Sequence, residues 1–161
     1  MKNSICSTIV ASFALCLATI PAPAMAAGFT PEGQQHWLEV ARALTVAANS
    51  EAEDMDAPCK GVTIMGGGSE IRHESALVPK WAVMAHFQTC IAFHIVAKGG
   101  KGFMHMNSGD ACKGIKAAVG ELGKAKPGVD PDDVVAAAGK LKGALTSLAA
   151  DFKDAKACRF G

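Results

Sequence analysis

The longest predominantly apolar stretch in the body of the chain runs from Val78 to Lys98. Helical spacing places one set of its apolar side chains on one face and a second set close to another face. The first set is Met84, Phe87, Ile91 and Ile95, and the second is Val83, Cys90, Phe93 and Ala97. A helix that is apolar on nearly every side is buried by its neighbours all round. We therefore expect this segment to be the central helix of a core.

A helix is also predicted before the central one, because Thr30-Pro31-Glu32 has the chemistry of a helix start. The threonine hydroxyl can cap, the proline is fixed for the first turn, and the carboxylate lies near the positive end of the helix dipole. Apolar residues then follow at helical spacing, namely Trp37, Val40, Ala41, Leu44 and Ala48. This helix should end within residues 49–56.

Two further helices are predicted after the central one. Ser108 or Asp110 can cap the first of them, in which Ala111, Ile115, Val119 and Leu122 share a face. The second opens with a cap, a proline and acidic residues at 130–133, after the break at Pro127-Gly128. Its apolar seam, spaced by four and three residues, is Val134, Ala138, Leu141, Leu145, Leu148 and Phe152.

Together these patterns predict an all-α protein, a small helical bundle of about four helices with long loops. No segment shows convincing strand alternation, so an up-and-down or similarly simple bundle is expected. The long loops are residues 57–77, which contain Gly66, Gly67 and Gly68, and residues 101–109. Long connections on a compact scaffold are where binding residues concentrate, so both loops are candidate binding segments.

The first 26 residues have the parts of a secretory signal in order: a basic start at Lys2, an apolar stretch and a small-residue site ending at Ala26. Cleavage there would leave residues 27–161 as a single helical domain. The apolar stretch is short and the cleavage signal follows directly, so no stable membrane insertion is expected after cleavage. We predict a periplasmic or secreted protein.

Four cysteines remain after the leader, and in an exported chain of this size they are expected to form two disulfides. They are Cys59, Cys90, Cys112 and Cys158. Three pairings are possible. Cys59 with Cys90 and Cys112 with Cys158 is favoured, since it lets the first long loop fold over the central helix. The rival pairing joins Cys90 to Cys112 and Cys59 to Cys158. No C-x-x-C occurs, which removes thioredoxin-type chemistry, c-type haem attachment and the usual zinc knuckle.

Charge excludes one class of partner. All fifteen acidic residues and all sixteen basic residues except Lys2 follow the leader, so residues 27–161 carry no net charge. A nucleic-acid-binding domain normally shows a basic excess or stripe, and this sequence has neither.

Two groups of residues could bind a metal. His86, Cys90 and His94 lie four residues apart on one predicted helix face, but the two histidines are about 12 Å apart and cannot share one ion. Oxidation of Cys90 would remove its thiolate as well. Met104, His105 and Met106 offer soft ligands that suit copper. A haem held by one histidine and one methionine in the bundle core is a further alternative.

The sequence contains no G-x-S-x-G elbow, H-E-x-x-H pair or catalytic-cysteine signature, so we predict that the chain is not an enzyme. The favoured interpretation is an exported, disulfide-stabilised helical binding module of the inhibitor, immunity or accessory type. Its expected partner is another exported or envelope protein. The residues expected to contact it are Gly66, Gly67, Gly68, His73 and Phe103. The alternative is a periplasmic copper- or haem-binding protein that uses His105, Met104, Met106, His86 or His94.

Overall fold

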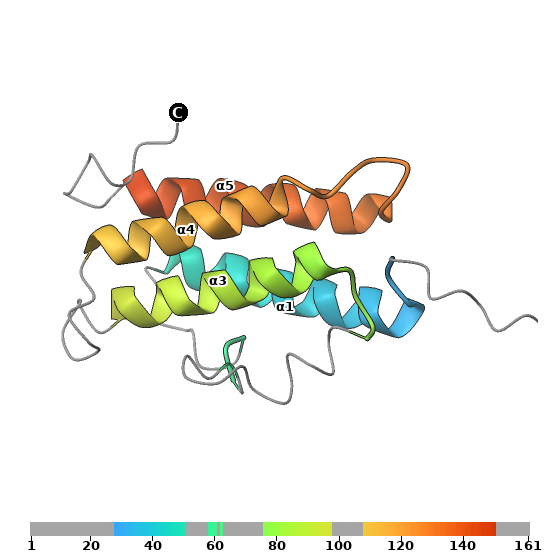
Figure 1. Cartoon of the computed structure of the whole chain (residues 1–161), viewed down its shortest axis with the longest axis horizontal. Helices are drawn as coiled ribbons and strands as arrows, with labels where there is room; N and C mark the ends of the chain where they lie inside the picture. The colour runs from blue at the N-terminus through green and yellow to red at the C-terminus, as the bar shows by residue number, and fades with distance from the viewer. Residues whose placement is uncertain (1–27, 51–57, 61, 63–75, 98–107, 151–161) are drawn as a thin grey trace, which may run out of the picture.

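A computed structural model describes residues 28–50, 58–60, 62, 76–97 and 108–150 of the chain (Figure 1). Four α-helices account for most of these residues, and the described part contains no strand. The helices are α1 (Pro31–Asn49), α3 (Lys80–Ala97), α4 (Ser108–Leu122) and α5 (Asp132–Ala150). The predicted all-α bundle is confirmed. Among the described helices, none combines the length and apolar character needed to cross a bilayer.

The start of α1 follows the chemistry of its sequence. Thr30 is the N-cap, and its hydroxyl accepts a hydrogen bond from the Gly33 amide at 3.0 Å, with Pro31 in the first turn. The last helix begins differently from the sequence prediction. The Asp130 carboxylate accepts from the Lys126 amide at 2.8 Å, so it closes the preceding turn rather than capping α5.

The helices pack as two pairs, α3 with α4 and α1 with α5, joined through α4 and α5 and more narrowly through α1 and α3. The buried face of α5 includes Val134, Ala138, Leu141, Leu145 and Leu148, as its spacing predicted. Small residues let α3 and α4 approach closely: a Cβ added at Gly114 would lie 3.2 Å from the Cβ of Ala92. The core is therefore a layer of apolar side chains between closely packed helices.

The direction of the chain is less simple than a strictly up-and-down bundle. Figure 1 shows α1, α3 and α5 running the same way, with α4 antiparallel to them. Two hydrogen bonds fix this arrangement. The Thr30 amide donates to the Leu77 carbonyl at 2.9 Å, and the Gln34 side chain donates to Asp133 at 2.9 Å. The N-terminal ends of these three helices therefore meet at one end of the bundle.

An aromatic cluster lies at that end. Phe29, Trp37 and Trp81 meet edge to face, with ring centroids 5.2–5.9 Å apart. The Trp37 indole donates to the Ala82 carbonyl at 3.4 Å, which satisfies its N–H in the core. The cluster joins Phe29, two residues before α1, to the second turn of α1 and the first turn of α3.

The prediction that α3 is buried all round is only partly correct. Its sides toward α1 and α4 are buried, and Phe93 and Thr89 are inaccessible. Met84, Phe87, Gln88 and Ile91, at helical spacing, are only half-buried. Neither α1 nor α4 covers this stripe completely, although the sequence there is as apolar as on the buried sides.

Candidate functional site

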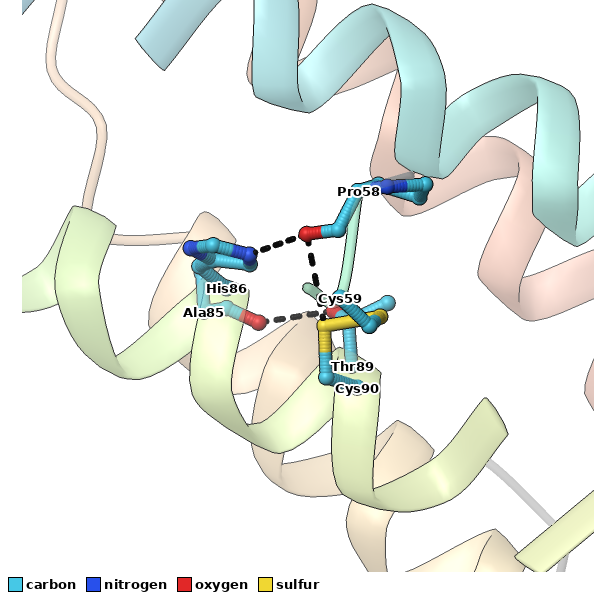
Figure 2. The surroundings of a disulfide bond; sticks show 6 residues. All are labelled: Pro58, Cys59, Ala85, His86, Thr89 and Cys90. Carbon is cyan, nitrogen blue, oxygen red and sulfur yellow. Dashed lines mark hydrogen bonds between the residues drawn. A yellow bond between two sulfur atoms is a disulfide. The ribbon is translucent and has the colours of Figure 1, made fainter. Parts of the chain in front are cut away.

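The connection between α1 and α3 is fastened to α3 by a disulfide. Cys59 pairs with Cys90, with Cα atoms 5.5 Å apart, which confirms the predicted pairing (Figure 2). Cys90 lies in the middle of α3 and is almost completely buried, whereas Cys59 is half-buried. The bond therefore holds the first part of the connection against the middle of the helix.

A hydrogen bond reinforces this attachment. His86 Nε2 lies 2.6 Å from the carbonyl oxygen of Pro58, the residue before Cys59. A carbonyl oxygen can only accept, so Nε2 carries a proton and donates. Cys90 Sγ approaches the same oxygen at 3.8 Å, but a disulfide sulfur has no proton, so this approach is a packing contact (Figure 2). His86 is 5 % exposed, which shields the bond from water.

A second attachment holds the end of the connection. The Leu77 carbonyl accepts from both the Thr30 amide, at 2.9 Å, and the Thr30 hydroxyl, at 3.3 Å. Gly33 makes this approach possible, because a Cβ there would lie 2.1 Å from the Leu77 oxygen. The connection is thus fixed at Cys59 on one side and at Leu77 on the other.

The two attachment points are close together compared with the chain between them. Cys90 is ten residues along α3 from Lys80, which corresponds to a rise of about 15 Å. The chain from Cys59 to Leu77 could reach about 60 Å if fully extended. The connection therefore contains far more chain than the span requires, and it carries the candidate residues Gly66, Gly67, Gly68 and His73. These four residues lie outside the described ranges, as does Phe103.

Two of the three potential metal ligands predicted on α3 have structural partners. Cys90 is oxidised and has no thiolate, and His86 uses Nε2 to bind Pro58. His94, one turn further on, is half-buried. Within the described residues, no group of three or more His, Cys, Asp or Glu side chains is arranged to hold a metal ion. Met104, His105 and Met106 lie outside those residues, so the copper and haem alternatives would depend on them.

Thr89, a fully buried polar residue in the middle of α3, is also satisfied within the helix. The Thr89 hydroxyl donates to the Ala85 carbonyl at 2.7 Å, and the residue is completely buried. Cys112 on α4 is disulfide-bonded and completely buried. Its predicted partner, Cys158, lies outside the described residues, so that pairing stays a prediction.

One surface feature was not identified from the sequence. A shallow groove of about 460 Å³ follows one face of α1 beside the start of α5. It is lined by Pro31, Gln34, Gln35, Leu38, Glu39, Arg42 and Asp133. The spacing of Gln34, Leu38 and Arg42 by four residues shows that they share a face. Sequence patterns do not indicate that α5 borders it, since that depends on the parallel packing of two helices far apart in the chain.

Comparisons with family models, curated proteins and solved structures find no match for this chain. Its function is therefore argued from its own residues.

Proposed function

We propose that this chain is an exported, disulfide-stabilised helical module that acts by binding another protein of the cell envelope or the secreted fraction. The observation that carries this proposal is the double attachment of the α1–α3 connection, at Cys59 through the disulfide and at Leu77 through Thr30. In this account the contact residues are those of the connection, with Gly66, Gly67, Gly68 and His73, assisted by Phe103.

Fixing both ends of a binding segment favours association for a physical reason. A free segment loses conformational entropy when it binds, whereas a segment closed by a disulfide and by hydrogen bonds has lost part of it on folding. The bundle supports this role, because its buried core joins the four described helices into one scaffold for the connection. Small proteins that bind by loops on a rigid scaffold use the same principle.

The disulfide also bears on where the protein works. Disulfides persist in oxidising compartments and are rare in the cytosol, and Cys59–Cys90 is typical of an exported protein. Together with the signal sequence predicted in residues 1–26, it supports a periplasmic or secreted location. The absence of net charge in residues 27–161 argues against an anionic polymer as the partner.

The alternative function, binding of copper or haem, would depend mainly on three of the ligands already expected for it. His86 and Cys90 have structural roles, so Met104, His105 and Met106 would supply most of the site. A metal-binding function predicts stoichiometric copper or haem and its loss on His105→Ala. The proposed binding module should retain its partner with this substitution unless residue 105 itself lies in the contact.

The proposal is tested by site-specific photocrosslinking in the producing cell. A photoreactive amino acid is placed at His73 in the connection and, as the control, at Lys142 on the exposed face of α5. We expect one discrete cross-linked protein from position 73 and none from position 142. Equal cross-linking from positions 73 and 142 would remove the proposed role of the connection. The absence of cross-linking both from position 73 and from a second probe at Phe103 would do so as well.

A further inference from the structure

The groove beside α1 has an ordered sequence of chemical groups. At one end the Gln34 amide donates to both carboxylate oxygens of Asp133, at 2.9 and 3.0 Å, and thereby holds that acidic group at the start of α5. In the middle, Leu38 is half-buried and packs against the core. At the other end is the Arg42 guanidinium. The order along the groove is acidic, apolar, basic.

The spacing of these groups is that of an α-helix. Gln34, Leu38 and Arg42 are four residues apart, so successive groups are separated by about 6 Å along the axis of α1. The hydrogen bond from Gln34 to Asp133 joins the starts of the two parallel helices at this end of the groove. The groove is lined by residues of α1 and, from α5, by Asp133.

Arg42 has capacity to bind a ligand. Within the described part of the chain it makes no hydrogen bond or ion pair, and its side chain is exposed. Glu39, the nearest acidic residue on the same helix, accepts instead from the Gln35 amide at 3.4 Å. This carboxylate stands beside Leu38 and would repel an acidic group at the centre of the groove. The centre therefore favours an apolar group, and the Arg42 end favours an acidic one.

We propose that this groove docks a helix of the partner protein that presents a basic, an apolar and an acidic residue at successive intervals of four. Such a helix, lying nearly parallel to α1, would place these side chains opposite Asp133, Leu38 and Arg42 in turn. This inference rests on the proposed protein-binding function and adds a second contact surface on elements other than the connection.

The test uses the disulfide-intact protein and three synthetic helical peptides of equal length. Each peptide has a central leucine. The residues four positions before and after it are Lys and Glu in the matched peptide, two Lys in the second and two Glu in the third. Binding is followed by NMR titration of the isotopically labelled protein at low salt, since exposed ion pairs are screened by added ions.

We expect the matched peptide to bind about 3- to 5-fold more tightly than either of the others, the range that one exposed ion pair supplies. The resonances of Gln34, Leu38 and Arg42 should shift. Arg42→Glu should reverse the preference in favour of the two-lysine peptide. Lys142→Glu makes the same change of charge on α5 outside the groove, and it should leave the order of the three peptides unchanged.

Three results would overturn this inference: equal binding of all three peptides, an unchanged order in Arg42→Glu, or shifts confined to residues outside the groove. These titrations need no natural partner, so their failure is separate from a failure of the photocrosslinking at position 73. Cross-linking without peptide discrimination would leave the connection as the binding surface and remove the groove. Peptide discrimination without cross-linking would leave the groove as the binding surface and remove the connection.

Discussion

At the scale of single residues, the Leu77 carbonyl determines how closely the end of the connection packs against the start of α1. The Leu77 carbonyl comes so near to Gly33 that the position excludes any side chain, and the same carbonyl accepts two hydrogen bonds from Thr30. Backbone approaches of this kind depend on residues far apart in the sequence. The sequence indicated that Thr30 would cap α1, and this is confirmed. Nothing in it indicated that Gly33 would touch Leu77.

Gly33→Ala tests this contact. The new methyl group would overlap the Leu77 carbonyl, so α1 and the end of the connection must separate, and we expect a loss of about 1–3 kcal/mol in the free energy of unfolding. Gly139→Ala is the matched control, because Gly139 lies within α5 and has nothing near its added Cβ. That substitution should stabilise the protein by up to about 1 kcal/mol through helix propensity. Urea denaturation of both variants measures the difference, and equal stabilities would contradict the contact.

The hydroxyl of Thr30 allows a second test at this scale. It accepts from the Gly33 amide at 3.0 Å and donates to the Leu77 carbonyl at 3.3 Å. Thr30→Ala removes both interactions and should cost about 1–2 kcal/mol in unfolding free energy, while Thr30→Ser should retain most of the stability. A serine variant as unstable as the alanine variant would show that the hydroxyl is not the stabilising group.

At the scale of the helices, sequence patterns were informative about existence and limits but not about arrangement. The apolar seam of α5 predicted its buried face, and the cap at Thr30 predicted the start of α1. The end of α1 at Asn49 lies at the beginning of the predicted range 49–56. The sequence patterns did not predict the direction of α1 relative to α3. It depends on where residues 50–79 return to the bundle, which local periodicity does not encode. For the same reason the half-buried stripe at Met84, Phe87 and Ile91 could not be distinguished from the buried sides of α3.

The disulfide between the connection and α3 allows a test at the scale of the helices. Cys59 and Cys90 are 31 residues apart, and opening a loop of this length should lower the free energy of unfolding by about 3–4 kcal/mol in the chain-entropy account. The variant that tests it changes both residues to alanine, which avoids a free thiol. Thermal and urea unfolding followed by circular dichroism provide the measurement. A loss below about 1 kcal/mol would indicate that the connection is held without the disulfide.

For the whole molecule, the fold was more accessible from the sequence than the function. The pairing of Cys59 with Cys90 was favoured because it lets the first long loop fold over the central helix, and the structure confirms this pairing. The possible ligand role of His86 was harder to judge, because the sequence pattern of a histidine on an apolar helix is the same whether the histidine binds a metal or a backbone carbonyl. Only the position of Pro58, in another part of the chain, distinguishes the two. The groove beside α1 could not be predicted for a similar reason, because it is bordered by Asp133 of α5, which is far from α1 in the sequence.

Both tryptophans provide a test of the assembled bundle. Trp37 and Trp81 are 3 % and 9 % exposed and contact each other at one end of the molecule. We expect the fluorescence of the folded protein to resemble that of tryptophan in an apolar environment, with little quenching by iodide and a red shift on unfolding. Strong iodide quenching in the native state would contradict the packing of this end.

We expect the chain to bind a protein, and its cysteines and His86 to have structural roles. Both expectations are tested together by native and denaturing mass spectrometry of the protein isolated without reductant, with and without a thiol-alkylating reagent. The measured mass should be that of a chain that begins after Ala26, takes up no alkylating reagent and carries no copper or haem, and the chain should be recovered with a protein partner under native conditions. Isolation of the chain alone with bound copper or haem, or alkylation at Cys90, would rule out this function.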